Sequence, residues 1–463
     1  MTQLYAHQAD AIERAKKGNT CLFHECGLGK TLTALEIIKF YKLPTLVVCP
    51  VSIIEAAWGE DTRKFAPELS IVSLWSKKPT ERIKRLNEPH DIYCCNYETL
   101  KLLYNQIAAK EFGLIIIDES SKLKNFKSQI TRAVLTFAGI QFRGSPWKTD
   151  HVIPHRYVMS GTPAPNDESE YWPQIKFITG MGNKCFHDNF YVFRNTYFNS
   201  IPLGLTGQKI FKFRSSLRNE FMTAMKPVVH VVKKKDALDL PEQIHEVRHV
   251  ILSKPEQDAY NTLKRELVLQ YGNETILAKT ALVEILKLRQ LSSGFAYTDT
   301  GVIRTGTSKL IELKNILEEI GIENQVIVWC TFREEVKQLL TELPDSQALW
   351  GETKDRETVI KDFQTGKFRI LVNQVQSAAH GLTFVNTAYS IYYSSNYSLE
   401  MQIQSEQRTH RIGQKKTCVY FHVLAKGTID EIIYRVIQRK SNLSESILNF
   451  LKNPLTQDNE EVR

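Results

Sequence analysis

The chain has 463 residues, of which 42% are hydrophobic and 24% are charged, so it has the composition of a globular protein with room for two or three domains. No apolar run approaches the length of a membrane-spanning helix, and we therefore expect no membrane partner. The formal net charge of +9 favours a polyanionic partner, usually a nucleic acid, although many basic proteins bind none.

Short β-rich runs recur along the chain, and each is followed by the periodicity of a helix. In the first half the runs are Thr45–Pro50, Ile92–Cys95, Leu114–Asp118 and Tyr157–Ser160. In the second half they are Val326–Cys330, Arg369–Val372, Ser390–Tyr393 and Cys418–Val423. Near-continuous apolar strands that alternate with helices are typical of parallel sheets covered on both faces. The sequence therefore predicts an α/β fold with two lobes in tandem.

The pattern changes between these two series. Residues 182–240 are rich in aromatic and basic side chains, and Ser253–Gln290 has the periodicity of helices. We interpret this middle part as helical insertions, with a linker near Lys233–Pro241. The segment Phe186–Arg218 allows two interpretations: its aromatic side chains either fill the core or stack on nucleic-acid bases.

The stretch FHECGLGKTLTALEII passes from an apolar run through Gly27 and Gly29 into a helix. Its Gly-Lys-Thr end fits the phosphate-loop pattern GxxxxGK[ST]. In such a loop the glycines let backbone N–H groups close on the phosphates, Lys30 reaches the β- and γ-phosphate oxygens, and Thr31 ligates Mg²⁺. The first glycine of the pattern is replaced by His24, so an ordinary strand-to-helix turn is the alternative interpretation.

The stretch LIIIDESS places Asp118 and Glu119 at the end of an apolar run. In a nucleotide site the first carboxylate would hold Mg²⁺, usually through water, and the second would polarise the attacking water. In isolation the pair could be two solvated acids at a strand end. Its position after a phosphate loop, in an α/β half, favours ATP hydrolysis with ATP and Mg²⁺ bound.

The stretch QIQSEQRTHRIGQ is predicted to place Gln404, Arg408 and Arg411 on one helix. Residues three apart lie on the same helix face, so the two arginines would project together. In a cleft they could neutralise charge on a transferring γ-phosphoryl group. Without a phosphate loop elsewhere, the same residues would indicate only a basic surface helix.

The eight cysteines are scattered, and no CxxC pair suggests a zinc site. Several lie inside apolar runs, where buried reduced thiols are expected. Cys26 lies within the predicted phosphate loop, where it either fills a small apolar niche or reacts as a thiolate. We expect a reducing compartment, and hence an intracellular protein of the cytoplasm or nucleoid, or of the host cytoplasm if a phage encodes it.

Taken together, the motifs resemble those of the Swi/Snf-type ATPases of helicase superfamily two, in that family's order and over nearly the whole chain. They are YAHQADAI, GLGKT, LVVCPVSIIEAAW, NYETL, IIIDESSKLKN, MSGTPAPN, VIVWCTF, WGETKDRETVIKDF, SAAHGLTF and QRTHRIGQ. The resemblance implies two RecA-like lobes, ATP in the cleft between them and double-stranded DNA tracked across both. The expected first lobe is residues 1–235, ending in a helical protrusion. The expected second lobe is residues 236–463, beginning with a helical protrusion at about 245–305.

The resemblance also implies roles for single residues. The expected nucleotide-binding residues are Gln8, Gly27, Gly29, Lys30, Thr31, Gly381 and Gln404. The expected catalytic residues are Lys30, Asp118, Glu119, Arg408 and Arg411. Thr31 and Asp118 would hold Mg²⁺, Gln8 would recognise adenine, and Arg408 and Arg411 would be finger arginines.

The residues at which the sequence departs from the family pattern bear on how ATP hydrolysis is coupled to DNA. The resemblance assigns coupling to Ser160–Thr162. His24 replaces an acidic residue of the family, Ser121 replaces the histidine that closes the DExH box, and Thr383 replaces an asparagine. None of these departures removes a residue expected to bind phosphate or metal, so we still expect ATP hydrolysis. We expect the coupling of hydrolysis to movement on DNA to differ from that of the family.

The leading functional interpretation is a monomeric, DNA-stimulated ATPase that translocates on double-stranded DNA and remodels bound protein or branched DNA. One alternative is a helicase that separates strands of DNA or RNA. A second alternative is a non-catalytic DNA-binding scaffold, against which the intact phosphate loop, carboxylate pair and paired arginines argue. The sequence specifies no protein partner.

Overall fold

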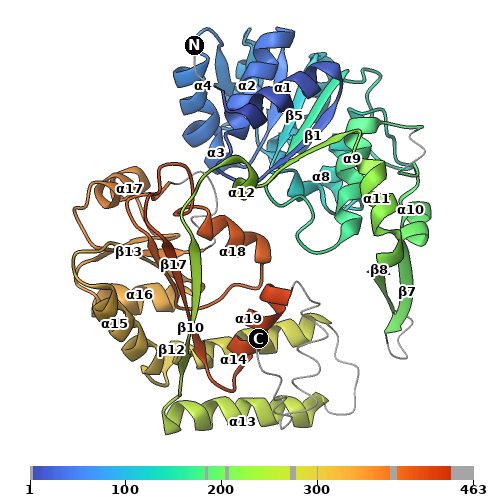
Figure 1. Ribbon diagram of the computed structural model, residues 1–463. Coiled ribbons are helices and arrows are strands. Elements are labelled where there is room, and N and C mark those ends of the chain that lie inside the picture. Colours follow the sequence, from blue (N-terminus) through green and yellow to red (C-terminus); the bar gives the residue numbers. More distant parts are fainter. Residues whose placement is uncertain are drawn as a thin grey trace. The chain divides into compact units, whose positions relative to one another are not determined.

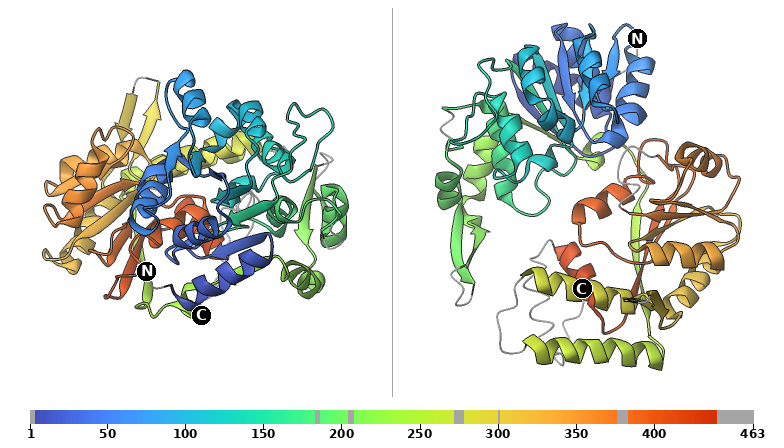
Figure 2. Two further views of the ribbon diagram at one scale, coloured as in Figure 1. Left: turned by 90° about the horizontal axis from the view of Figure 1, so that it is seen from above. Right: turned by 180° about the vertical axis from the view of Figure 1, so that it is seen from behind.

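The computed structural model describes residues 4–182, 186–203, 208–271, 278–299, 301–375 and 383–439. The chain forms two compact units, Met1–Asp239 and Leu240–Arg463 (Figure 1; Figure 2). Each unit is built on a parallel sheet with helices around it, and this confirms the predicted α/β class. Within the described ranges, no helix is both long enough and apolar enough to cross a bilayer.

The first unit contains a seven-stranded sheet with the order β3-β4-β2-β5-β6-β1-β9, in which neighbouring strands are parallel. Its strands are β1 (Thr20–His24), β2 (Thr45–Val48), β3 (Ile71–Ser73), β4 (Ile92–Cys95), β5 (Leu114–Asp118), β6 (His155–Met159) and β9 (Val229–Val232). Its α-helices are α1 (Ala6–Lys17), α2 (Lys30–Tyr41), α3 (Val51–Ile53), α4 (Glu60–Phe65), α5 (Pro79–Asn87), α6 (Tyr97–Leu102), α7 (Tyr104–Ala109), α8 (Gln129–Thr136), α9 (Tyr171–Thr179), α10 (Phe190–Tyr197), α11 (Arg218–Met225) and α12 (Lys234–Ala237). A π-helical turn, Ile54–Gly59, joins α3 to α4, and short 3₁₀ turns cover Ser120–Leu123, Glu168–Glu170 and Ser215–Leu217.

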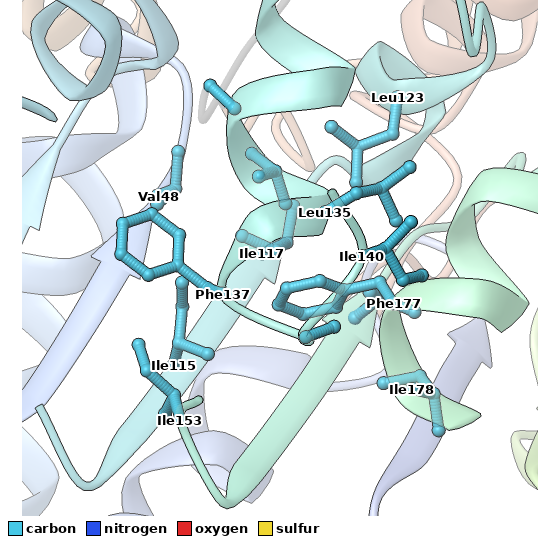
Figure 3. Close-up of a cluster of buried hydrophobic side chains, with 14 of the residues drawn as sticks. Val48, Ile115, Ile117, Leu123, Leu135, Phe137, Ile140, Ile153, Phe177 and Ile178 are labelled. Atoms are coloured by element: carbon cyan, nitrogen blue, oxygen red, sulfur yellow. The ribbon is translucent and has the colours of Figure 1, made fainter. Parts of the chain in front are cut away.

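This sheet is buried on both faces, because alternate side chains of a strand enter two separate hydrophobic clusters. Ile115 and Ile117 of β5 join a cluster that also contains Phe137 and Phe177, shown in Figure 3. Ile116, between them, belongs to the other cluster. Burial on both faces favours apolar side chains from Leu114 to Ile117, which explains why β5 appears in the sequence as a continuous apolar run that ends at Asp118, with the predicted bounds.

The second unit contains a six-stranded parallel sheet with the order β10-β17-β16-β13-β15-β14. Its strands are β10 (Gln243–Val250), β13 (Val326–Cys330), β14 (Ser346–Leu349), β15 (Ile370–Gln374), β16 (Tyr389–Tyr392) and β17 (Cys418–Ala425). Its helices are α13 (Lys254–Tyr271), α14 (Ala278–Ser292), α15 (Ser308–Ile320), α16 (Arg333–Glu342), α17 (Arg356–Gln364), α18 (Leu399–Glu406) and α19 (Ile429–Arg439).

The interpretation of the middle of the chain as helical insertions is only partly right. Two antiparallel hairpins occur there, β7 (Phe198–Leu203) with β8 (Gln208–Phe213) and β11 (Phe295–Thr298) with β12 (Gly301–Arg304). In addition, β9 and β10 are edge strands of the two sheets, and β10 occupies the start of the helical protrusion expected at about 245–305. An edge strand is only partly covered, so its sequence lacks a continuous apolar run. The QIHEVRHV stretch of β10, mostly exposed or half-buried, is such a case.

Candidate nucleotide-binding site

Three loops of the first unit lie at one edge of its sheet. The strands β1, β6 and β5 are parallel neighbours, so their carboxyl ends lie side by side. Glu25–Gly29 follows β1, Ser160–Thr162 follows β6, and Asp118 ends β5. In parallel α/β sheets, ligands bind outside this edge. The structure therefore brings the predicted phosphate loop and the predicted carboxylate pair to one edge of the sheet.

The phosphate loop adopts backbone angles that require its glycines. Gly27 and Gly29 have φ values of 88° and 70°, in the left-handed region that other residues rarely adopt. Gly29 directly precedes α2, whose first residue is Lys30, so the helix N-terminus opens at the loop. His24, where the strict pattern has glycine, is an ordinary strand residue paired with Val232 of β9. Its extended backbone explains why the loop tolerates a histidine there.

Lys30 is folded over its own loop. Its Nζ donates hydrogen bonds to the carbonyl oxygens of His24, at 2.9 Å, and Glu25, at 3.5 Å. The same Nζ lies 3.9 Å from the Sγ of Cys26. An ammonium group held over the loop by carbonyl oxygens can exchange these acceptors for phosphate oxygens, which form stronger charge-assisted bonds.

Asp118 is the last residue of β5, and its side chain is almost fully buried. Its Oδ2 accepts a 3.0 Å hydrogen bond from the indole N–H of Trp58, and its Oδ1 accepts one of 3.0 Å from the backbone N–H of Glu119. Burial raises the pKa of Asp118, whereas the charge of Lys30 and these two hydrogen bonds act in the opposite direction. A desolvated carboxylate of this kind gains stability as an anion when a cation binds beside it.

Tyr97 holds the backbone turn that contains the carboxylate pair. Its hydroxyl donates to the carbonyl oxygen of Asp118, at 2.7 Å, and lies 3.1 Å from that of Glu119. Glu119 has a φ of 54°, which is unusual for a residue other than glycine. Strained backbone of this kind is common at functional sites. Sequence reasoning gave Tyr97 and Trp58 no role, although both lie within the quoted motifs NYETL and LVVCPVSIIEAAW.

The oxygen groups at this edge fit Mg²⁺. Magnesium prefers hard oxygen ligands and is commonly held by one or two protein groups together with substrate phosphates. Asp118 offers a carboxylate, and the hydroxyl of Thr31 makes no hydrogen bond to any other described residue. Within the described ranges, no group of three or more His, Cys, Asp or Glu forms a metal site of its own. The chemistry of Asp118 and Thr31 therefore fits Mg²⁺.

The loop after β6 packs directly on the phosphate loop. A Cβ atom added at Gly161 would lie 2.9 Å from the Sγ and 3.1 Å from the backbone nitrogen of Cys26, so only glycine fits there. Ser120, in the turn after the carboxylate pair, donates a 2.6 Å hydrogen bond to the amide oxygen of Gln174. The amide nitrogen of Gln174 donates in turn to the carbonyl oxygen of Pro163, at 2.6 Å. Gln174 thus links two of the three loops, a role that its sequence context did not suggest.

Gln8 contacts the phosphate loop from α1. Its Nε2 lies 3.4 Å from the carbonyl oxygens of both Leu28 and Gly29, and its Oε1 accepts a 2.9 Å hydrogen bond from the N–H of Tyr5. The adjacent His7 also contacts the Leu28 carbonyl oxygen, at 3.0 Å. The structure thus places Gln8 against the loop, and its recognition of adenine stays a prediction.

A chain of three polar side chains lies behind the loop. Nε2 of His24 lies 2.7 Å from Nδ1 of His230, and Nε2 of His230 lies 2.9 Å from a carboxylate oxygen of Asp10. Burial, together with the nearby His230, Lys30 and His7, lowers the pKa of His24 to about 2. If the Nε2–H of His230 donates to Asp10, neutral His24 donates its own Nε2–H to the Nδ1 of His230. These hydrogen bonds connect β1 to β9 and to α1.

The predicted arginine helix in the second unit ends earlier than expected. Helix α18 ends at Glu406, so Gln404 is helical, whereas Arg408 and Arg411 lie in the turns that follow. The prediction that the two arginines share one helix face is therefore wrong. After the helix, the N–H of Arg408 bonds to the carbonyl oxygen of Ser405, at 3.1 Å, in a tighter turn. The Arg408 carbonyl oxygen accepts a 2.8 Å hydrogen bond from the N–H of Phe384.

The two arginines are nevertheless positioned by specific contacts. Arg408 is almost fully buried, and Nη1 of Arg411 donates a 2.5 Å hydrogen bond to the hydroxyl of Thr383. Thr383 is one of the departures from the family pattern, so the residue that replaces asparagine contacts an expected finger arginine. Gln404 is buried, and its Nε2 lies 3.4 Å from a carboxylate oxygen of Glu400. Gly381 lies outside the described residues.

Comparisons with known proteins cover both units. Residues 10–294 match the family model described as SNF2-related domain, and residues 308–413 match the one described as helicase conserved C-terminal domain. Protein p41 of Acyrthosiphon pisum secondary endosymbiont phage 1 is 26% identical over 446 residues, which cover 92% of this chain and 93% of p41. The Caenorhabditis elegans homolog of SWI/SNF-related matrix-associated actin-dependent regulator of chromatin subfamily A-like protein 1 is 25% identical over 452 residues.

The extent of these similarities differs between relatives. The match to the nematode protein covers 95% of this chain but 61% of the relative, so the chain spans about three fifths of that protein. The solved Sulfolobus solfataricus SWI2/SNF2 ATPase core in complex with dsDNA is 21% identical, with a TM-score of 0.44 and coverage of 98% of this chain and 97% of that one.

Proposed function

The chain belongs to the SNF2-related family of helicase-type ATP hydrolases, and on this premise we propose that it couples ATP hydrolysis to translocation along double-stranded DNA. The observation that carries the proposal is the pair of family matches, which together extend over both units, with the SNF2-related domain first and the helicase C-terminal domain second. The net charge of +9 supports a polyanionic track.

We propose the following roles for residues of the first unit. Lys30 leaves the carbonyl oxygens of its own loop to neutralise the β- and γ-phosphates, while backbone N–H groups between Gly27 and Thr31 enclose them. Mg²⁺, when bound with ATP, supplies charge neutralisation at the same phosphates. Asp118 and the Thr31 hydroxyl are the groups of this chain that would hold it.

Glu119 is the proposed group that orients the attacking water. Its backbone is fixed next to Asp118 by the Tyr97 hydroxyl, so the two carboxylates come from one rigid turn. Arg408 and Arg411 of the second unit are proposed to accelerate hydrolysis by neutralising charge that develops on the γ-phosphoryl group.

DNA binding is proposed to be largely independent of sequence, because a motor that advances along a track must grip the phosphate backbone rather than base edges. Such binding releases counterions, so a log–log plot of affinity against salt should have a slope of about −0.9 for each phosphate neutralised on a duplex.

The deciding experiment measures ATP turnover with duplex DNA, single-stranded DNA and RNA side by side. We expect the strongest stimulation by duplex DNA, together with ATP-dependent displacement of a third strand from a triplex and little strand separation on tailed duplexes. Glu119→Gln, which should bind DNA without turnover, is the control for ATP dependence. Strand separation, or preferred stimulation by RNA, would instead assign a strand-separating helicase. An absence of ATP turnover would contradict the proposal.

A further inference from the structure

A β-hairpin extends from the first unit, away from its sheet. Among the described residues, its strands β7 and β8 pair only with each other. Figure 1 and the right-hand view of Figure 2 both show the hairpin reaching beyond α10 and α11. A two-stranded hairpin is marginally stable by itself, so this one depends on support at its root.

Aromatic side chains provide that support. Phe198 and Phe213, which are opposite each other at the root, have ring centroids 5.5 Å apart. The ring of Phe213 lies 5.2 Å from that of Phe221 in α11, and the N–H of Arg214 donates a 2.8 Å hydrogen bond to the carbonyl oxygen of Tyr197. Phe198 and Phe221 are almost fully buried. The core interpretation is thus right for these aromatics, which mount the hairpin rigidly on the unit.

All charged side chains between residues 190 and 218 are positive. Between residues 190 and 218 there is no acidic residue, and the basic residues are Arg194, Lys209, Lys212, Arg214 and Arg218. The guanidinium carbon of Arg194 lies 3.5 Å from the centroid of the Phe211 ring, which holds this cation against the hairpin. Lys209 and Lys212 are exposed and form no ion pair with any described residue. Arg218 pairs with Glu168 at 2.7 Å, so the positive charge that no described acid neutralises lies on Lys209 and Lys212 of the hairpin.

An aliphatic pair lies on the face of the hairpin that also carries Lys212. Ile201 and Ile210 are directly opposite each other, so their side chains share one face of the hairpin, and Asn199 with Lys212 follow on the same face. Ile201 is 45% exposed. Contact with water gives its aliphatic side chain no stabilisation. Lys209, opposite Pro202, lies on the other face of the hairpin. The hairpin thus combines an exposed aliphatic pair on one face with one lysine on each face.

We propose that the hairpin contacts DNA at a junction between duplex and single strand. Ile201 and Ile210 pack on the flat, apolar face of the last base pair, as apolar side chains do when they wedge against base steps, while Lys209 and Lys212 neutralise flanking phosphates. A continuous duplex exposes no such face, so the aliphatic pair adds affinity only at a junction. The inference rests on the proposed DNA translocation, and it specifies the DNA structure that the motor prefers.

The test compares the affinity of the full chain for a forked duplex and for a covalently closed circular duplex of equal length, which has no exposed base-pair face. We expect the unmodified chain to prefer the fork. The double variant Ile201→Thr with Ile210→Thr keeps β-branched side chains suited to a strand, and it should lose roughly tenfold in affinity for the fork alone. The double variant Ile201→Val with Ile210→Val, which stays apolar, should retain the preference.

The lysines are tested through salt dependence. Lys209→Ala with Lys212→Ala should make the log–log salt slope for the fork shallower by about 2, since two phosphate contacts are lost. Lys77→Ala with Lys78→Ala, an exposed pair before α5 with the same loss of charge, is the matched control and should change the slope less. Unchanged DNA-free ATP turnover shows that each variant is folded.

The outcomes separate this inference from the proposed function. Equal affinity of the unmodified chain for fork and closed circle would overturn the inference, and so would a threonine variant that keeps the fork preference or loses affinity equally for both DNAs. A hairpin-dependent fork preference in a chain whose ATP turnover no DNA stimulates would support the inference and overturn the proposed translocation alone.

Discussion

The Nζ atom of Lys30 lies 2.9 Å from the carbonyl oxygen of His24, the residue that ends β1. Because this acceptor belongs to the loop itself, we propose that phosphate oxygens replace the bond when a nucleotide binds. The His24 backbone is in turn fixed by its pairing with Val232 of β9, and its imidazole by His230. The position of Lys30 thus depends on a strand more than two hundred residues further along the chain.

Glu119→Gln should bind ATP normally but lose turnover by about 10²–10⁴-fold, because the substitution removes the carboxylate that orients water and keeps the side chain's size. Binding of a fluorescent ATP analogue and release of phosphate are the two measurements. Lys30→Ala is the comparison, and it should weaken binding and turnover together. Near-normal turnover by purified Glu119→Gln would reject the assignment of this carboxylate.

Arg411→Ala should bind ATP nearly normally and hydrolyse it roughly 10³-fold more slowly, even with DNA present, because an arginine that neutralises the transferring phosphoryl group acts mainly in the transition state. Arg333→Ala, which removes an exposed arginine of the same unit, is the matched control. If Arg411→Ala instead loses DNA affinity and keeps its DNA-free turnover, Arg411 is a phosphate-backbone contact.

The stability of the first unit should fall as the solution becomes acidic, partly because of His24. Its pKa is lowered from an ordinary value near 6.5 to about 2 in the folded chain, so between these values the unfolded chain binds a proton that the folded chain does not. Stability therefore rises with pH across this window. His24 should remove about 2 kcal/mol of unfolding free energy between pH 7 and pH 5.

The pH effect is checked by urea unfolding at both pH values, with His24→Gln as the comparison. Glutamine keeps an Nε2 donor for His230 and cannot titrate, so the variant should lose about 2 kcal/mol less than the unmodified chain between the two pH values. Parallel losses in the two proteins would show that His24 does not titrate on unfolding.

Cys26 should be the cysteine that a small alkylating reagent modifies fastest among the described cysteines. It is half-buried, whereas the other described cysteines are buried, and burial raises the pKa of several of them, including Cys49 and Cys94. Modification should stop ATP hydrolysis, and ATP with Mg²⁺ should protect, because Cys26 lies 3.9 Å from the amine of Lys30. Cys26→Ala should be active and resistant. Inactivation of that variant at the unmodified rate would place the reactive thiol elsewhere.

Much of the candidate site's arrangement could be predicted from the sequence, because its groups follow strands that are buried on both faces. Such strands favour apolar residues, as in Leu114–Ile117, so they are visible without a structure, and so are polar residues at their ends such as Asp118. The Gly-Lys-Thr triplet is equally local, since the left-handed angle at Gly29 and the helix that starts at Lys30 are set by neighbouring residues. These features are determined by sequence because their physical causes lie within a few residues.

Only the tertiary structure decided the contacts that hold these groups in place. Trp58 donates a hydrogen bond to Asp118, 60 residues further along the chain, and His24 contacts His230, 206 residues further along. No local sequence pattern indicates either contact. The end of α18 before Arg408 was equally hidden, and the Arg408 carbonyl oxygen bonds there to Phe384 of a different segment. The hairpin of β7 and β8 exists because buried aromatics support its root, and a two-stranded hairpin would gain too little stability from its own sequence. Where the free energy of a local conformation comes from distant partners, the sequence alone does not reveal it.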